Sequence, residues 1–174
     1  EIGSLGKPFT SIALLQLRDE GALDLNAPVT QYLPWFQVRS SSPPIKVHHL
    51  LNHTAGLPRG TDLAPHGLYE AWALRERTTS APPGDYFSYS NIGYKSLGFL
   101  LEHLTGQRFG EAIRARVLNP LGMAATHPAI THETRKVTAT GYCGYYDDRP
   151  EHPRHEIVPA IWAEYSTGDG CEAS

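Results

Sequence analysis

The segment that decides the fold lies near the start of the chain, where a polar turn leads into an apolar run. Residues 4–17 read Ser4-Leu5-Gly6-Lys7-Pro8-Phe9-Thr10-Ser11-Ile12-Ala13-Leu14-Leu15-Gln16-Leu17. From Phe9 to Leu17 the apolar side chains fill more than half of a helical surface, which is typical of a largely buried helix. Pro8 suits the first turn of such a helix, where it forfeits at most one backbone hydrogen bond. Gly21 is the end signal, so we expect this helix to form the centre of a domain.

Further helical patterns follow, and loop signals separate them. The apolar periodicity predicts a short segment at 29–33 and helices at 47–51, 68–76, 94–104 and 109–118. The sharpest break is Pro82-Pro83-Gly84, which excludes regular pairing. Beyond Met123 the pattern weakens: residues 138–146 could form a strand, and Pro150, Pro153 and Pro159 favour irregular structure. We therefore expect one partial domain over 1–174, mainly α, with a helical region at 1–122 and a loop-rich region at 123–174.

The composition excludes several classes of function. The chain has 174 residues, of which 40% are hydrophobic and 19% charged, as in a globular domain rather than a disordered segment. Its net charge is −3 and Lys and Arg do not cluster, which argues against a nucleic-acid partner. No window approaches the roughly 20 apolar residues of a membrane span. Cys143 and Cys171 allow either a disulfide or two free thiols, so the compartment stays open: periplasmic, secreted or cytoplasmic.

Ser4 and Lys7 form the first candidate catalytic pair. Residues three apart at the start of a helix share a face, so the Lys7 amine can reach the Ser4 hydroxyl. A serine hydroxyl becomes a strong nucleophile when a base accepts its proton, and a desolvated lysine can be that base. Backbone N–H groups at the helix N-terminus can donate to an oxyanion formed beside the serine. The spacing alone is common by chance, so its position before a buried helix carries the argument.

The second candidate is the segment Tyr89-Ser90-Asn91, between the Pro-Pro-Gly break and a helix. A tyrosine beside a cation can act as a general base. Asn91 could orient Lys7 or bind a substrate carbonyl. The structural alternative is that Tyr89 packs in a half-buried position and that Asn91 is the N-cap of the next helix.

Three histidines, His48, His49 and His53, lie close together in the sequence. His49 and His53 are four residues apart, a spacing that can hold zinc on a helix. No Asp or Glu lies among them, and Thr54-Ala55-Gly56 ends the helix at once. We therefore favour a structural role for these residues and expect no metal and no other cofactor.

Taken together and in this order, the motifs resemble those of the serine β-lactamase and penicillin-binding-protein superfamily. The stretch from Ser4 to Thr10 is similar to the active-site serine segment of that superfamily. Three further stretches resemble its class C-like branch, which includes esterases and D-amino-acid peptidases. They are Val47-His48-His49-Leu50-Leu51-Asn52-His53-Thr54-Ala55-Gly56-Leu57-Pro58, Pro83-Gly84-Asp85-Tyr86-Phe87-Ser88-Tyr89-Ser90-Asn91 and Leu118-Asn119-Pro120-Leu121-Gly122-Met123. The end of the chain, from Gly168 to Ser174, is similar to a glycine-rich segment found downstream of these.

The resemblance implies the helical region of the α+β β-lactamase/transpeptidase-like fold, with most of its antiparallel sheet missing from these residues. It makes Ser4 the acylated nucleophile, Lys7 its proton partner, Tyr89 the general base and Asn91 a substrate-orienting side chain. It also implies that His53 belongs to a structural turn after a short helix.

One motif of the superfamily has no counterpart in the chain. The third motif, Lys-Thr-Gly or His-x-Gly on a sheet strand, is matched neither by His155-Glu156-Ile157 nor by Ser166-Thr167-Gly168. We therefore expect the chain to be a piece of a larger enzyme, or else a damaged one.

These observations leave two functions open. The leading one is a serine hydrolase that acts through a Ser4 acyl-enzyme on a small-molecule or peptide substrate with an ester, amide or β-lactam bond. The alternative is a catalytically silent binding or structural module, which the missing third motif favours. In either case the helical part should expose an apolar face where the sheet packs, so we expect self-association and little activity from the 174 residues alone. The late aromatic residues either shape the active-site cleft or pack beneath a long loop; they are Tyr142, Tyr145, Tyr146 and Trp162.

Overall fold

The structure, a computed structural model, describes residues 2–39, 43–60, 67–128, 132–139, 142–147 and 154–159. Its helices are α1 (Gly6–Asp19), α2 (Val29–Tyr32), α3 (Val47–Leu51), α4 (Gly67–Ala73), α5 (Asn91–Thr105), α6 (Phe109–Ile113) and α7 (His132–Arg135). Three tighter or wider turns extend them: η1 (Gly3–Leu5) before α1, η2 (Leu74–Glu76) after α4, and the π-type η3 (Arg114–Leu118) after α6. Strands β1 (Tyr142–Asp147) and β2 (Arg154–Pro159) pair antiparallel.

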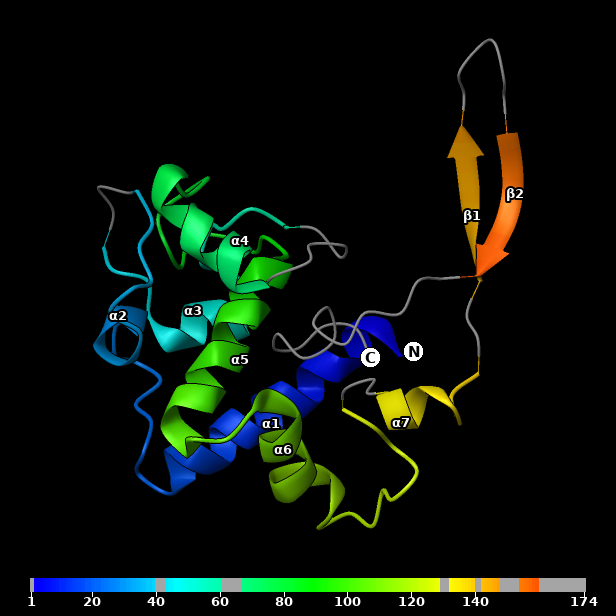
Figure 1. The fold of residues 1–174 in the computed structure, drawn as a ribbon. Helices are drawn as coiled ribbons and strands as arrows, with labels where there is room; N and C mark the ends of the chain where they lie inside the picture. The colour runs from blue at the N-terminus through cyan, green and yellow to red at the C-terminus, as the bar shows by residue number, and fades with distance from the viewer. Residues whose placement is uncertain are drawn as a thin grey trace.

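Helix α5 is the centre of the helical body, and α1, α3, α4 and α6 pack around it (Figure 1). Every residue from Asn91 to Gly98 is buried. A helix that is buried on all sides belongs to the core of a domain. Ser90 caps its N-terminus by accepting a hydrogen bond from the Gly93 N–H at 3.1 Å. Gly106, with φ +66°, closes its C-terminus in the left-handed conformation that glycine adopts without strain.

The helices follow the sequence patterns closely. Helix α3 has the predicted bounds, α6 and η3 together cover 109–118, and α4 and η2 cover 67–76. Helix α1 begins at Gly6 with Pro8 in its first turn, as predicted. Helix α5 begins at Asn91 rather than Tyr94, because the Ser90 cap starts the helix before the apolar run begins.

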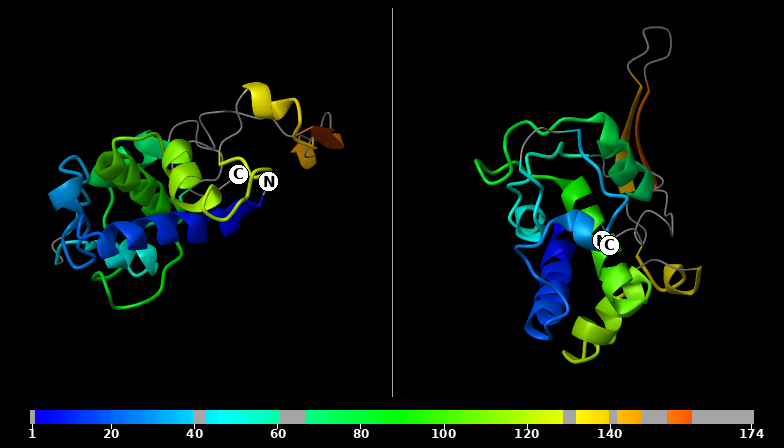
Figure 2. Two further views of the ribbon diagram at one scale, coloured as in Figure 1. Left: turned by 90° about the horizontal axis from the view of Figure 1, so that it is seen from below. Right: turned by 90° about the vertical axis from the view of Figure 1, so that its left-hand side faces the viewer.

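The strand pair is where the sequence prediction was partly wrong. The predicted strand at 138–146 is observed as β1 over 142–147, whereas β2 lies in a segment expected to be irregular. The register pairs Tyr142 with Pro159, so this proline stands at the end of β2, where a missing N–H is tolerated. The strand pair stands apart from the helical body in Figures 1 and 2. Trp162, Cys171 and the glycine-rich end lie outside the described residues.

The core is mainly aliphatic, and most of its side chains come from the facing helices. Leu14 of α1, Leu50 of α3 and Leu97, Leu100 and Leu101 of α5 are at most 1% exposed. Burying a leucine side chain stabilises a fold by about 1.5–3 kcal/mol, so these positions hold the helices at fixed spacings. In the described part of the chain, no helix combines the length and the apolar character that crossing a membrane requires.

One face of α1 is not covered. Leu5 is 67% exposed and Ile12 is 44% exposed. Pro8 and Phe9 lie between them on the same side of the helix, because helical residues three or four apart are neighbours. Pro8 is exposed, whereas Phe9 is half-buried and packs partly against the core. We call Leu5, Pro8, Phe9 and Ile12 the α1 stripe. It is the kind of exposed apolar face that the sequence predicts.

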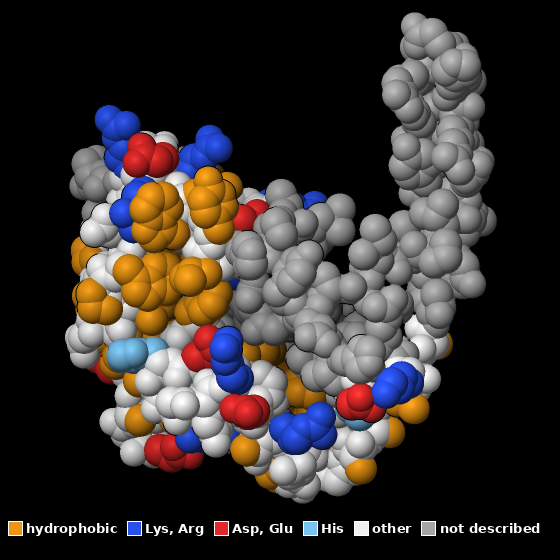
Figure 3. Space-filling model, viewed as in Figure 1, with side chains coloured by type: hydrophobic (Ala, Val, Ile, Leu, Met, Phe, Trp, Pro, Cys, Tyr) orange, Lys and Arg blue, Asp and Glu red, His pale blue; other side chains and the backbone are white. Residues whose placement is uncertain are grey.

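Apolar side chains also gather over α2, α4 and α5 on the face shown in Figure 3. Trp35 and Phe99 contact each other edge to face, with ring centroids 5.9 Å apart. Trp72 is 46% exposed, and the Arg75 guanidinium lies 3.7 Å from the centroid of its ring. The Arg75 guanidinium therefore covers one face of the Trp72 ring, and this part of the apolar surface is not open to water.

Candidate active site

Three of the four predicted site residues meet at the start of α1. Ser4 Oγ lies 2.6 Å from the Tyr89 hydroxyl oxygen. Lys7 Nζ donates a hydrogen bond to Ser4 Oγ at 2.9 Å. Ser4 lies in η1 and Lys7 in the first turn of α1, whereas Tyr89 comes from the segment just before α5. The fold therefore joins residues that are 85 positions apart in the chain.

Lys7 is buried, with 5% of its surface exposed. Its Nζ lies 5.0 Å from the centroid of the Tyr89 ring and 5.6 Å from that of Tyr94. At these distances a ring face attracts an ammonium group. Among the residues that the structure describes, none of the ion pairs involves Lys7. Its amine is thus held by two aromatic rings and directed at the Ser4 hydroxyl.

Tyr94 completes this cluster from α5. Its hydroxyl donates to the Leu51 carbonyl at 2.9 Å and lies 3.0 Å from Ser11 Oγ. A tyrosine hydroxyl has one hydrogen, so in this arrangement Ser11 is the donor to Tyr94. These two bonds tie α5 to α1 and to the end of α3. They fix the position of a ring that Lys7 contacts.

The loop before α5 is held in place by the turn that follows α3. The Ser88 N–H donates to the His53 carbonyl at 2.7 Å, and the Ser80 N–H donates to the Gly56 carbonyl at 2.8 Å. Gly56 has φ +67°, and a Cβ added there would lie 2.7 Å from the Ala81 carbonyl oxygen. Only glycine allows this approach of the two backbones. The residues on both sides of the Pro82-Pro83-Gly84 break are thus hydrogen-bonded to the turn that follows α3.

His53 lies in this turn, as predicted, with a left-handed φ of 59°. Its Nδ1 accepts a hydrogen bond from the Ser90 N–H at 3.2 Å, which places the ring proton on Nε2. Burial, and secondly the charge of Lys7, hold the pKa of His53 below its usual value of 6.5. In the described residues, no group of three or more His, Cys, Asp or Glu side chains is placed to hold a metal ion.

Asn91 is the fourth predicted site residue. It is the first residue of α5 and is 3% exposed. Its backbone N–H donates to the Arg59 carbonyl at 2.7 Å. The alternative that Asn91 is the N-cap is wrong, because Ser90 caps the helix. Its role toward a substrate stays a prediction.

Sequence reasoning missed two residues beside the site, Ser11 and Tyr94. Ser11 follows Lys7 by four residues on α1, and Tyr94 follows the cap Ser90 by four on α5. Residues four apart on a helix share a face, so helical spacing from the motif residues was the signal that could have found both.

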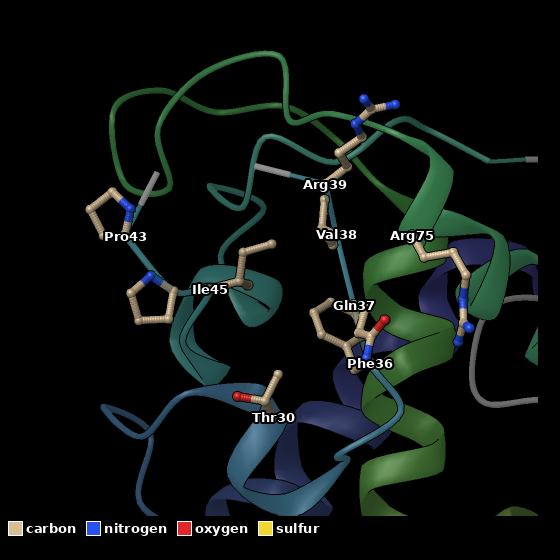
Figure 4. Close-up of a pocket in the computed structure, with 9 residues that line it drawn as sticks. Thr30, Phe36, Gln37, Val38, Arg39, Pro43, Ile45 and Arg75 are labelled. Carbon is tan, nitrogen blue, oxygen red and sulfur yellow. The ribbon is translucent and has the colours of Figure 1, made fainter. Parts of the chain in front are cut away.

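A surface pocket of about 400 Å³ lies elsewhere on the molecule (Figure 4). The residues that line it are Thr30, Phe36, Gln37, Val38, Arg39, Pro43, Pro44, Ile45 and Arg75. They come from α2, η2 and the two segments that flank residues 40–42, and none of them belongs to the cluster around Ser4. The pocket is therefore separate from the candidate catalytic residues.

Comparison with protein families gives a match to the family described as Beta-lactamase, over residues 1–163. Among curated proteins, the chain is 36% identical over 143 residues to esterase EstB of Burkholderia gladioli, covering 70% of this chain and 36% of the esterase.

Solved structures agree over almost the whole chain. The octameric penicillin-binding protein homologue from Pyrococcus abyssi matches with a TM-score of 0.76 and 30% identity, over 98% of this chain and 41% of that one. The beta-lactamase/D-alanine carboxypeptidase from Yersinia pestis, complexed with citrate, matches with a TM-score of 0.75 and 25% identity, over 98% and 48%. The chain thus spans less than half the length of these proteins, and its helices are the helical part of their fold.

Proposed function

Because this chain belongs to the beta-lactamase family, we propose that the full-length protein is a serine hydrolase in which Ser4 is acylated. The observation that carries this proposal is the position of Ser4 Oγ, 2.6 Å from the Tyr89 oxygen and 2.9 Å from Lys7 Nζ. Both distances lie within the reach that proton transfer requires. Ser4 is also exposed while Lys7 is buried, so a substrate can approach the hydroxyl from the solvent side.

In the proposed first half-reaction, Tyr89 acts as the general base: its oxygen accepts the Ser4 proton while Ser4 Oγ forms a bond to the carbonyl carbon. The π electrons of the carbonyl move onto its oxygen and give a tetrahedral oxyanion. Lys7 Nζ donates to Ser4 Oγ and stabilises the negative charge that develops there. The positive end of the α1 dipole lies beside Ser4 and favours the negative charge of the oxyanion. When the intermediate collapses, the bond to the leaving group breaks and the leaving group takes the proton from the Tyr89 hydroxyl.

In the second half-reaction, water replaces the leaving group. The oxygen of the water molecule attacks the acyl carbon, and the Tyr89 oxygen accepts a proton from that water. The bond between Ser4 Oγ and the acyl carbon then breaks, and the proton returns from Tyr89 to Ser4. Over the whole cycle, one water is consumed, the protonated leaving group and a carboxylic acid are formed, and the free enzyme is regenerated.

The proposed substrate is an acyl compound with an ester, amide or β-lactam bond. Two of the matched proteins are named an esterase and a beta-lactamase/D-alanine carboxypeptidase, which supports this class. The residues that the structure describes around Ser4 fix the attacking oxygen and its proton partners. They do not select among the three bonds, so the test uses more than one probe.

The test is covalent labelling of the full-length protein, followed by peptide mass mapping. A fluorescent fluorophosphonate reports an activated serine, and a fluorescent penicillin reports acylation by a β-lactam. We expect an adduct on Ser4 and no labelling of Ser4→Ala. The matched control is Ser11→Ala, which removes a nearby serine hydroxyl on α1 and should still label on Ser4. An adduct on a different residue, or full labelling of Ser4→Ala, would refute the proposal.

A further inference from the structure

The imidazole of His53 packs against the ring that carries the proposed general base. Its ring centroid lies 4.5 Å from that of Tyr89, with 35° between the ring planes. It lies 5.0 Å from the Tyr94 ring centroid at 38°, and 5.6 Å from that of Phe87 at 80°. The imidazole therefore contacts both rings that surround the Lys7 amine.

His53 also holds the backbone on both sides of Tyr89. The Ser88 N–H donates to the His53 carbonyl at 2.7 Å, and the Ser90 N–H donates to His53 Nδ1 at 3.2 Å. Both neighbours of Tyr89 in the sequence are thus hydrogen-bonded to His53, and the Tyr89 ring packs on the His53 imidazole. His53 therefore contacts three consecutive residues, with Tyr89 in the middle.

From this geometry we infer that His53 is a positioning residue, whose neutral imidazole holds the Tyr89 oxygen against Ser4. The inference rests on the proposed function, because it concerns how the proposed base is aligned. It does not make His53 a base itself, since Nδ1 is occupied by the Ser90 N–H. Small misplacements of a reacting group lower a rate steeply, so a residue with this role should affect turnover.

Histidine meets three requirements at this position that other residues meet only in part. The backbone has a φ of 59°, which histidine and asparagine tolerate better than most residues. The ring must fill the space between Tyr89 and Tyr94. The side chain must also accept a hydrogen bond from the Ser90 N–H. Asparagine keeps the backbone and an acceptor but lacks the ring, whereas phenylalanine keeps the ring and lacks the acceptor.

The inferred role depends on the protonation state of the imidazole. A protonated Nδ1 is a donor and cannot accept from the Ser90 N–H. The titratable or charged groups that face the imidazole in the described residues are Lys7 from α1, Tyr89 from the loop and Tyr94 from α5. Burial and the Lys7 charge favour the neutral form. Acid should therefore release Tyr89 from its position while the protein is still folded.

The experiment compares His53→Asn and His53→Phe in the full-length protein, with p-nitrophenyl ester turnover as the readout. Rates are divided by the concentration of sites that react with the fluorophosphonate, so that a smaller folded fraction does not count as lost activity. We expect kcat to fall about tenfold or more in His53→Asn with KM changed less than about twofold, and a smaller fall in His53→Phe. The matched control is His49→Phe, which removes a buried imidazole whose Nδ1 accepts from the Lys46 N–H and whose ring packs on His48.

The pH profile supplies a readout that a merely structural role would not change. Burial and the Lys7 charge lower the pKa of His53, so wild-type kcat should decline only at a pH below the ordinary histidine pKa of about 6.5. Both His53 variants should lose this decline. A kcat per reactive site within about twofold of wild type in both variants, or a decline that persists in both, would overturn the inference. If neither variant folds, NMR of the wild-type protein follows the protonation of His53, and a kcat that stays constant while this imidazole protonates contradicts the inference. Labelling of wild-type Ser4 tests the proposed function separately, whatever the His53 variants do.

Discussion

Tyr89 contributes two separable groups to the site: an oxygen 2.6 Å from Ser4 Oγ and a ring that packs on His53 and lies near Lys7 Nζ. Tyr94 offers the same two groups with different partners. Its ring also faces Lys7, but its oxygen bonds to the Leu51 carbonyl and to Ser11. The two tyrosines therefore allow the chemistry of the hydroxyl to be separated from the packing of the ring.

We predict that Tyr89→Phe lowers the rate of Ser4 acylation by about 10²-fold or more, which is the usual effect of removing a general base. Tyr94→Phe should instead cost about 1 kcal/mol of stability through its lost hydrogen bonds and keep most of the acylation rate. Stopped-flow labelling and urea unfolding of the full-length protein measure the two effects. Equal losses of acylation in both variants would show that the Tyr89 oxygen has no special role.

Two histidines make stability depend on pH. Burial lowers the pKa of His49 and of His53 below 6.5, aided by the nearby charges of His48 and Lys46 for the first and of Lys7 for the second. Below that pH the unfolded chain binds protons that the folded chain does not. The free energy of unfolding should thus fall as the pH drops below about 6.5. This fall should end once the pH lies below the pKa values of the two histidines in the folded state.

We therefore predict that His49→Gln reduces this fall in stability. Glutamine keeps an acceptor for the Lys46 N–H at the third position of α3 and removes the titrating ring. The measurement is a series of urea unfolding curves at pH values from about 7 to about 5. The control is His103→Gln, which removes an exposed histidine from α5. A pH dependence that is the same in His49→Gln as in wild type would contradict the assignment.

At the scale of the elements, the N-terminus of α5 is the point where fold and site join. Ser90 Oγ accepts from the Gly93 N–H at 3.1 Å and donates to the Pro58 carbonyl at 2.7 Å. Ser90 directly follows Tyr89 in the sequence, and its backbone N–H donates to His53 Nδ1. The helix start, the loop after α3 and the Tyr89 segment therefore share one residue.

We predict that Ser90→Ala costs about 2 kcal/mol of stability, because it removes the cap and leaves the buried Gly93 N–H without its side-chain acceptor. The matched control on the same helix is Ser96→Ala. Ser96 Oγ donates only back to the Ile92 carbonyl one turn earlier, so its loss should cost less than about 1 kcal/mol. Urea unfolding of the full-length protein measures both. A cost for Ser96→Ala as large as that for Ser90→Ala would argue against the cap.

The elements also show what the sequence could predict. The bounds of α3 and of α6 with η3 came from local apolar periodicity, and the pairing of Ser4 with Lys7 came from helical spacing. The contact of Ser4 with Tyr89 spans 85 residues, so no local pattern contains it, and only the resemblance brought the two together. Strand β2 was missed because flanking prolines hid a short β-branched segment, and pairing with β1 is not a local property.

For the whole molecule, the described residues form one helical body with an uncovered face. The α1 stripe leaves Leu5 67% and Ile12 44% exposed, directly beside the proposed nucleophile. The matched proteins are more than twice as long as this chain, and an apolar face of this kind marks a place where another surface packs. When the 174-residue chain is studied alone, a second copy of the same chain can pack on the α1 stripe.

We predict that the 174-residue chain self-associates and that the double variant Leu5→Gln with Ile12→Gln raises the apparent dissociation constant by about tenfold or more. Sedimentation velocity over a range of concentrations measures this shift. The control is Leu68→Gln with Tyr69→Gln, which removes side chains that are 49% and 70% exposed on α4. An equal shift in the control, or a wild-type chain that is monomeric throughout, would contradict a role for the stripe.

The separation of Ser4 from Tyr89 has a consequence for synthesis. At about 5–20 residues per second, the ribosome takes roughly 4–17 s to add the 85 positions that separate the two residues. Helix α1, with its leucines, leaves the exit tunnel long before the α5 segment that buries them. The nascent chain thus presents the α1 leucines without α5 for several seconds. A chaperone that binds such segments, such as a holdase, should have its strongest nascent-chain site in residues 5–17, and crosslinking of stalled ribosomes would locate it.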